Sequence, residues 1–505
     1  MQRVVAGVAC RFEERIADIL APGVVRMGLA LGCNLSWSHM AFESLGLFHD
    51  QPDAEVVLDT VYLISIACAL LTYLIVALVC HCGRKFAGSR STCGLVSLSA
   101  AASTVVMHGA TTTTAIGGAC IVIGGIGSGV ATSLFMMYFG IALSTMRTKR
   151  VMAISAIGYI VSTVLFSVYL FFEPFAAMVL CASMLPIAAA LLVFGSMGAA
   201  SGPCSQGETP PSRNLVSPED CRQLKGLVRA FSVCMLVSGF VYEIARTVFI
   251  QVGGFAGETV ENYAFAQGVV AALVLLAAIG ITLVIVSSSN VHAPEICYRI
   301  SACCLVVSAL LILMPIVYPD ASVVVPLAIN NASFMCLNML MWVLVCGVCN
   351  QLSDSSARFF ALFRAAWTAG PLLGMLVGRF LYFSCGYTLQ AAFLAMAASV
   401  LALFAMLEFV FTEERLSRAL SIMPIERKRR FVERCNAVIE QYGLTEREGE
   451  IMVMFAKGRN LPYVMEELVL SKSTVSTHRQ HIYKKLGVHS AQEMIDVIQN
   501  VTLRG

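Results

Sequence analysis

Long apolar runs, separated by short polar stretches, make up the first four fifths of the chain. A helix needs about 20 apolar residues to cross the roughly 30 Å hydrocarbon core of a bilayer. The pattern therefore predicts twelve transmembrane helices, at about 24–47, 56–80, 92–111, 116–145, 151–171, 175–196, 226–250, 262–288, 299–318, 322–349, 360–383 and 387–411.

The composition agrees with a multi-pass membrane protein. The 505 residues are 58% hydrophobic and only 13% charged, whereas soluble domains carry roughly 25% charged residues. The 19 cysteines are scattered through the apolar runs, which favours reduced packing residues over a disulfide framework. Charged residues between Arg11 and Asp18 interrupt any apolar run near the N-terminus, so we expect no cleaved signal peptide.

The loops between the predicted helices fall into two sets by charge. One set is basic and holds Arg3, Arg11, Arg15, Arg84, Lys85, Arg90, Arg147, Lys149, Arg150, Arg213, Arg222, Lys225, Arg299 and Arg358. The alternate loops lack Lys and Arg and hold Asp50, Asp53, Glu55, Glu173, Glu258, Glu261 and Asp320. Since basic loops stay cytoplasmic, we expect both termini in the cytoplasm and the helices in the inner, cytoplasmic membrane.

A long polar loop at 197–225 divides the predicted helices into two groups of six, 24–196 and 226–411. This layout resembles the major facilitator superfamily of transporters. The loop Cys82–Arg90 is similar to the basic glycine loop of that family, without the acidic residue expected there. We take residues 1–411 as one transmembrane domain on this basis.

Several ionisable side chains fall in the outer halves of the predicted spans. Such groups are costly in lipid and usually face a cavity or a partner. They form a candidate ligand pocket of His39, Glu43, His108, Glu243, Arg246 and Arg379. The alternative is that they snorkel to the headgroups, with one ion pair between Glu243 and Arg246 at i,i+3 spacing. Arg26 and Arg364 lie near cytoplasmic helix ends, where we expect snorkelling.

Residues 412–442 change abruptly to a basic composition and form a predicted cytoplasmic linker. The run Glu426–Arg430 is expected to attract anionic headgroups, at about 1 kcal/mol for each basic residue. Beyond it Phe431, Cys435, Val438, Ile439 and Tyr442 recur at helical spacing, which predicts an amphipathic helix leading into the C-terminal domain.

The last segment, 443–505, predicts four short helices. Capping signals mark their starts at Thr445-x-x-Glu448, Asn460, Ser471 and Ser490-x-x-Glu493. The third helix is expected to bury Val475, His478, Ile482 and Leu486 and to stop at Gly487. It is basic, whereas acidic residues lie on the other three, so one helix has the charge to enter a DNA groove.

This segment resembles the LuxR-type, or GerE, helix-turn-helix of bacterial transcription regulators. The matching residues are Leu444, Thr445, Arg447, Glu448, Glu450, Ile451, Gly458, Leu468, Ser471, Thr474, Val475, His478, Ile482, Tyr483, Lys485, Leu486, Gly487, Val488 and Ser490. Met465 and Ala491 depart from the family, which commonly has alanine and arginine at these positions.

The resemblance implies which side chains meet DNA. Ser476, Thr477 and Gln480 face base edges, and Lys472, Thr474, Arg479, Lys484 and Lys485 contact phosphates or flanking positions. It also implies a homodimer formed through the fourth helix on a two-fold promoter site. His478 is expected to be a partly buried packing residue.

The whole sequence therefore predicts an all-α, membrane-tethered regulator that binds double-stranded promoter DNA and lies in the lipid bilayer. Its bundle would sense a small-molecule or envelope signal; alternatives are a secondary transporter with an autoregulatory tail, or a bundle that merely anchors the tail. We find no nucleophile–base pair and no phosphate loop, since Gly125 and Gly129 are spaced for helix packing. Cysteines 80, 82, 346 and 349 are interpreted as packing residues, so we expect no enzymatic activity, cofactor or metal.

Overall fold

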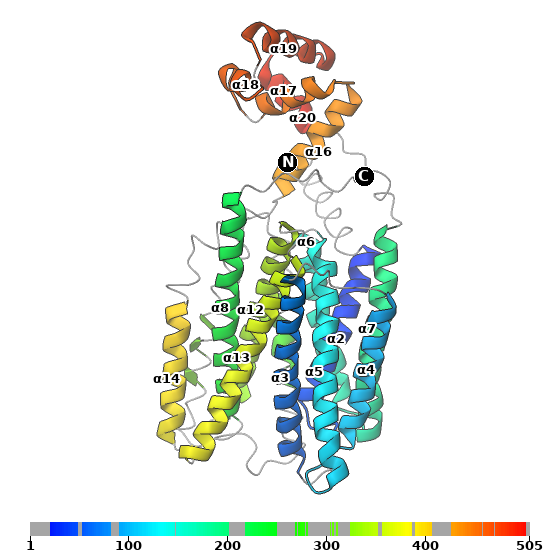
Figure 1. The fold of residues 1–505 in the computed structure, drawn as a ribbon, viewed down its shortest axis with the longest axis vertical. Helices are drawn as coiled ribbons and strands as arrows, with labels where there is room; N and C mark the ends of the chain where they lie inside the picture. Colours follow the sequence, from blue (N-terminus) through cyan, green and yellow to red (C-terminus); the bar gives the residue numbers. More distant parts are fainter. Residues whose placement is uncertain are drawn as a thin grey trace, which may run out of the picture. The chain divides into compact units, whose positions relative to one another are not determined.

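The computed structural model describes residues 21–48, 53–81, 90–146, 148–200, 218–249, 324–351, 356–385, 389–406, 426–456, 458–468 and 470–500, with short stretches between 268 and 311. Within these ranges the regular structure is helical, with no strand. The chain divides into two compact units, Met1–Ala419 and Leu420–Gly505 (Figure 1).

The first unit contains long helices that correspond to ten of the twelve predicted spans. They are α2 (Pro22–Phe42), α3 (Ala54–His81), α4 (Arg90–His108), α5 (Ala115–Ser144), α6 (Thr148–Tyr169), α7 (Pro174–Ala200), α8 (Pro218–Phe249), α12 (Val324–Gln351), α13 (Ser356–Cys385) and α14 (Leu389–Ala405). The predicted helices at 262–288 and 299–318 lie mostly outside the described residues.

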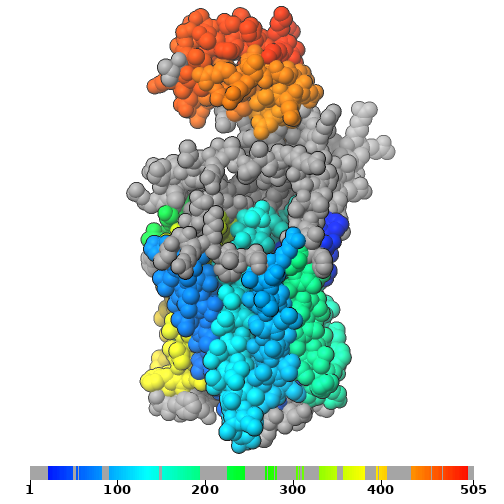
Figure 2. All heavy atoms as spheres, turned by 45° about the vertical axis from the view of Figure 1, so that its right-hand side comes forward, coloured from blue at the N-terminus to red at the C-terminus, as the bar shows by residue number. Residues whose placement is uncertain are grey.

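Eight of the described helices are long and apolar enough to cross a membrane. Their outward sides carry exposed apolar residues, such as Leu71 and Leu78 on α3, Leu95 on α4 and Ile123 on α5. The blue and cyan helices of Figure 2 form one such face. Exposed leucine and isoleucine in this quantity suit a surface covered by lipid, because soluble proteins rarely expose large apolar patches.

Two groups of helices make up the bundle. In the first group α2 packs against α6 and α7, and α5 packs against α3 and α4; in the second, α8 packs against α13, α12 and α14. The groups meet where α3 lies along α13 and where α12 lies along α6 (Figure 1). Side chains on these four helices can therefore form polar contacts between the two groups.

Small residues bring α5 close to α3, as the spacing of Gly125 and Gly129 predicted. A Cβ atom on Gly125 would lie 2.8 Å from Cγ2 of Ile64, and one on Gly129 would fall on the carbonyl oxygen of Ser65. Side chains larger than hydrogen would force the two backbones apart. The predicted packing role of these glycines is confirmed.

The second unit contains five short helices around one apolar core. They are α16 (Glu426–Gln441), α17 (Glu446–Ala456), α18 (Leu461–Leu468), α19 (Lys472–Leu486) and α20 (Ala491–Asn500). Val475, Ile482 and Leu486 of α19 are buried in this core together with Cys435 and Val438 of α16. The amphipathic helix expected within the linker therefore packs as part of the DNA-binding unit, against α17 and α20.

The helix ends of the second unit form as the sequence predicts. Thr445 and Glu448 make a reciprocal capping box, with Thr445 N–H donating to Glu448 Oε2 at 2.8 Å and Glu448 N–H donating to Thr445 Oγ1 at 3.3 Å. The Asn460, Ser471 and Ser490 side chains accept equivalent bonds from backbone N–H groups at 3.1–3.2 Å. Gly487 ends α19 in the left-handed conformation, with φ of 67°.

Candidate nucleic-acid interface and polar sites of the bundle

One face of α19 is buried and the opposite face is exposed. Val475, Ile482 and Leu486 are at most 6% exposed, whereas Thr477, Gln480 and Lys484 all lie on exposed positions. The i, i+3, i+7 spacing of the exposed residues puts them on one side of the helix. The structure therefore brings together two of the expected base-reading residues and one expected phosphate contact.

The other expected DNA contacts surround this face. Lys472 is exposed in the first turn, and Thr474 and Ser476 are partly exposed. Arg479 is also partly exposed, and its guanidinium lies 5.8 Å from the ring centroid of Phe455 on α17. This cation–π contact holds the arginine against the domain while its charge stays near the surface.

Lys484 and Lys485 are neighbours in sequence but differ in their surroundings. The Lys485 ammonium donates to Glu448 Oε2 at 2.7 Å and to the Gly443 carbonyl oxygen at 3.0 Å. We find no hydrogen bond or ion pair for the Lys484 ammonium to any residue that the structure describes. The geometry thus ties Lys485 to its own domain and leaves Lys484 available for a phosphate.

Glu448 links the capping box to α19. Its side chain is 5% exposed, and burial alone would raise the pKa of this carboxyl group. The hydrogen bonds from Lys485 and Thr445 outweigh burial and hold the pKa of Glu448 below its usual value. The glutamate is therefore ionised at neutral pH and joins the start of α17 to the end of α19.

His478 lies on the inner side of α19, as predicted for a packing residue. It is partly buried, and its Nδ1 atom is enclosed without a hydrogen-bond partner among the described residues. Packing against the domain core is enough to explain this position, without a role for His478 in DNA binding or pH sensing.

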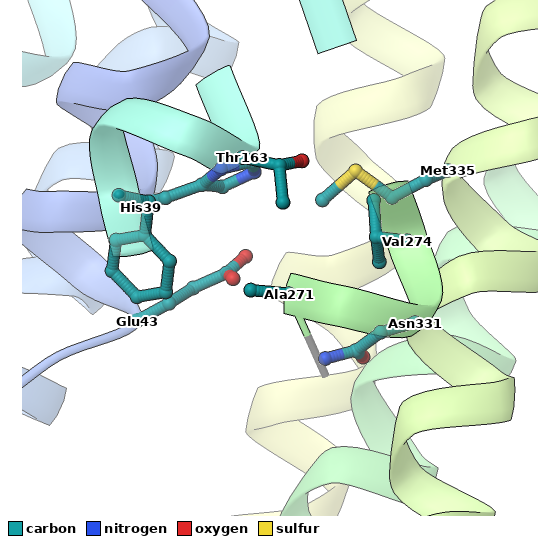
Figure 3. A pocket seen from close by; sticks show the side chains of 8 residues that line it. His39, Glu43, Thr163, Ala271, Val274, Asn331 and Met335 are labelled. Carbon is teal, nitrogen blue, oxygen red and sulfur yellow. The ribbon is translucent and has the colours of Figure 1, made fainter. Parts of the chain in front are cut away.

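A second candidate site lies between the two helix groups of the bundle. It is lined by His39 of α2, by Glu43 directly after that helix and by Thr163 and Phe166 of α6. Asn331 and Met335 of α12 line it as well, together with Ala271 and Val274. Figure 3 shows His39 and Glu43 on one side and Val274, Asn331 and Met335 on the other. The pocket is small, with a cavity volume of about 20 Å³, which is enough for an ordered water molecule.

The residues expected in one pocket are dispersed in the structure. Only His39 and Glu43 line it; His39 Nδ1 lies 3.1 Å from Ser162 Oγ. His108 Nδ1 instead lies 2.9 Å from the Leu47 carbonyl oxygen in the α2–α3 connection. Glu243 is buried in α8 at 1% exposure, and the Arg246 side chain lies outside the described side chains.

Arg379 is paired with a residue that sequence reasoning did not single out. Its Nε donates to Asp59 Oδ2 at 3.0 Å, and its Nη2 contacts the same oxygen. Because Asp59 is on α3 and Arg379 on α13, this ion pair joins the two helix groups. Asp59 is the only acidic residue inside the span predicted at 56–80. Because a charged residue in a membrane span usually has a partner, this isolated acid was the signal that could have identified the pair.

Arg364 does not snorkel, contrary to the expectation from its sequence position. It is 4% exposed, and its guanidinium lies 4.1 Å from the ring centroid of Trp367. Its Nε donates to the Tyr73 hydroxyl at 3.3 Å. The inward face of α13 directs the side chain into the bundle, where packing between α3, α12 and α13 encloses it.

The C-terminal geometry is that of a four-helix DNA-binding domain with an added helix. Residues 443–498 match the family of bacterial regulatory proteins called the luxR family, or GerE. This part of the chain is a LuxR-type helix-turn-helix domain.

Curated relatives match the same region. An uncharacterised response regulatory protein, YgeK, of Escherichia coli K12 is 42% identical over 65 residues, 12% of this chain and 44% of that protein. The Fimbriae Z protein of Salmonella typhimurium is 40% identical over 53 residues, 10% of this chain and 25% of that protein. The chain thus spans less than half the length of these relatives.

The bundle resembles a solved transporter structure. A bacterial homologue of the iron transporter ferroportin, in its outward-facing state, aligns with 77% of this chain and 99% of its own, with a TM-score of 0.51 and 11% sequence identity. At this identity the likeness concerns the fold alone. The predicted fold class, an all-α transporter-like transmembrane bundle followed by a LuxR-type domain, is confirmed.

Proposed function

We propose that this protein is a membrane-tethered transcription regulator whose bundle controls DNA binding by the C-terminal domain. The observation that carries the proposal is one chain holding a LuxR-type domain, at residues 443–498, and a bundle with helices long enough to span a membrane. Its partners are double-stranded promoter DNA, the lipid bilayer and a small-molecule or envelope signal.

The orientation follows from the charges of the loops. With basic loops in the cytoplasm, both termini are cytoplasmic and the DNA-binding domain is on the side of the inner membrane where the chromosome lies. Alkaline phosphatase fused after Thr113, between α4 and α5, should be active because it is exported. The same enzyme fused after Met146, between α5 and α6, should be inactive; the reverse pattern would contradict the orientation.

On DNA, α19 lies in the major groove with Ser476, Thr477 and Gln480 towards base edges. Lys472, Thr474, Arg479 and Lys484 contact the backbone. Lys485 is assigned to the domain itself, because its ammonium is bound to Glu448. A homodimer through α20 would place two α19 helices on a two-fold site.

The test of regulation is to map bound DNA across the genome and then measure binding of the full-length protein to a recovered site. Changing Arg479 and Lys484 together to alanine should weaken binding and reduce its dependence on salt. Arg229→Ala, on α8 of the bundle, is the matched control and should bind normally. Unchanged binding by the double variant would contradict the proposed interface.

Control by the bundle needs a separate test. Replacing residues 1–411 with an unrelated membrane anchor should abolish inducible regulation if the bundle senses the signal. If induction survives this replacement, the bundle only anchors the domain. Variants of His39 and Glu43 should alter the response to signal and leave DNA binding by the tail intact, because both line the pocket between the helix groups.

The alternative function is secondary transport with an autoregulatory tail. The fold likeness to a ferroportin homologue over 77% of the chain favours it. Uptake of labelled ferrous iron into vesicles, lost in Glu243→Ala, would support transport. Signal-dependent regulation by a protein that moves no solute would leave sensing as the function of the bundle.

A further inference from the structure

Arg364 is a buried cation for which the described residues supply no carboxylate partner. It is 4% exposed, and none of the described residues forms an ion pair with it. Its one side-chain hydrogen bond among them goes from Nε to the neutral Tyr73 hydroxyl. An isolated charge is costly in an apolar interior unless it is paired, and among the described residues Arg364 has aromatic rings and one hydroxyl around it in place of an anion.

The aromatic residues beside Arg364 add further unused donors. The Trp367 and Trp342 ring centroids lie 4.1 Å and 5.7 Å from the guanidinium carbon. The Nε1 atoms of both indoles are buried and lack a hydrogen-bond acceptor in the part of the chain that the structure describes. Buried donors are nearly always satisfied, and here the two indole N–H groups beside the guanidinium have no acceptor among the described residues.

The chemistry of this cluster selects a class of ligand. The guanidinium edge matches a carboxylate, whose two oxygens can accept parallel hydrogen bonds. Arg364 supplies a single positive charge, so a monoanion neutralises it, whereas a dianion would leave excess charge in an apolar site. Tyr73, Trp342 and Trp367 surround the guanidinium with apolar ring atoms, and such surroundings suit an apolar ligand body.

One face of α12 connects this cluster to the pocket between the helix groups. Asn331, Met335, Asn338 and Trp342 follow i, i+4, i+7, i+11 spacing and so lie on the same side of the helix. The first two line the pocket, and Asn338 donates to the Tyr159 hydroxyl at 3.2 Å. The stripe covers about 16 Å at 1.5 Å per residue.

We propose that Arg364, Trp342 and Trp367 form a binding site for a small organic monocarboxylate with an apolar body. Tyr73 on α3 orients the guanidinium from the other helix group. A carboxylate bound here would connect α12, α13 and α3, the helices at which the two groups meet. The site goes beyond the proposed regulatory function and does not depend on DNA binding.

Tryptophan fluorescence of the full-length protein in detergent or nanodiscs gives a direct measurement. The chain has only three tryptophans, and two belong to the site, so Trp37→Phe removes the background. The probe is cyclohexanecarboxylate, which does not absorb at tryptophan wavelengths; cyclohexanecarboxamide is its neutral isostere. We expect saturable quenching by the acid and none by the amide.

Variants at Arg364 separate binding from packing. Arg364→Gln should weaken carboxylate binding roughly 10- to 100-fold, the effect of losing hydrogen bonds to a charged group. Arg379→Gln, on the same helix but paired with Asp59, is the matched control and should bind like the wild type. Arg364→Met should leave the ligand-free protein at least as heat-stable as the wild type, because an unpaired buried charge is removed.

Three results would overturn the proposal. They are equal binding by wild type and Arg364→Gln, equal binding of acid and amide, and quenching by inorganic phosphate or chloride as strong as by the carboxylate. A lower melting temperature for Arg364→Met, with no rise in wild-type stability on adding the acid, would assign Arg364 to packing. None of these outcomes bears on DNA binding, so the proposed function would stand or fall separately.

Discussion

Lys485 at the end of α19 lies 2.7 Å from Glu448 in the first turn of α17. The same carboxylate caps α17 through the Thr445 N–H. One buried glutamate therefore joins a helix cap to the helix expected to read DNA, and the neighbouring Lys484 takes no part in this contact.

The two lysines should separate stability from DNA affinity. Lys485→Met should lower the free energy of unfolding of the domain by about 1 kcal/mol, a modest value because the ammonium is partly exposed. Lys484→Met should leave stability unchanged, weaken binding to all sequences alike and reduce the salt slope by about 1. Urea unfolding and binding titrations at several salt concentrations measure both. Equal effects of the two changes on affinity would contradict the assignment.

The ionisation of Glu448 predicts an acid dependence of stability. Since the folded pKa of Glu448 is lower than the ordinary value of 4.5, the contribution of its carboxylate to stability is fully present above that pH. The contribution is lost as pH falls through the folded pKa. Glu448→Gln should cost about 1 to 2 kcal/mol at pH 7 and flatten the stability curve below pH 4.5. Glu450→Gln, an exposed residue two positions on, is the control.

Packing of α16 predicts that the DNA-binding unit needs residues before its family match. Cys435 and Val438 are fully buried in the core shared with α17 and α20. The free energy of unfolding of a fragment of residues 420–505 should exceed that of a fragment of residues 443–505 by at least about 3 kcal/mol, because the longer fragment buries these two side chains. Circular dichroism during urea unfolding measures the difference. Equal stabilities would show that α16 packs without stabilising the domain.

The crossing of α3 and α5 can be tested with two glycines of one helix. Gly129→Ala should lower the free energy of unfolding by about 1 to 3 kcal/mol, since its Cβ would meet the Ser65 backbone. Gly118→Ala meets no atom within 4 Å and should be neutral or stabilising by up to about 1 kcal/mol. Thermal unfolding of the purified protein in detergent compares them, and similar losses would argue against tight packing at Gly129.

Local signals made most of the C-terminal domain predictable. Its caps at Thr445, Asn460, Ser471 and Ser490 and the buried positions of α19 each depend on residues within one or two turns. The membrane helices were predictable for the same reason, because length and apolarity are properties of single segments. The sequence did not predict that α16 belongs to the domain core, because this depends on contacts with α17 and α20 that form only in the folded domain.

The polar sites of the bundle were harder to predict. Arg364 donates to Tyr73 across 291 positions of sequence, and Arg379 pairs with Asp59 across 320. The position of Arg364 near a cytoplasmic helix end suggested snorkelling. Its burial instead depends on which helices pack over it, and this is decided by the arrangement of the bundle. Hydrophobic pattern identifies spans and says little about which of their faces meet.

The burial of Cys435 gives the DNA-binding unit its own chemical reporter. It is the only cysteine after residue 412, and it is fully enclosed where α16 meets the core. A thiol reagent can reach it only after α16 separates from α17 and α20. The rate at which Cys435 is alkylated therefore measures how often α16 separates from the rest of the domain, with no probe engineered into the protein.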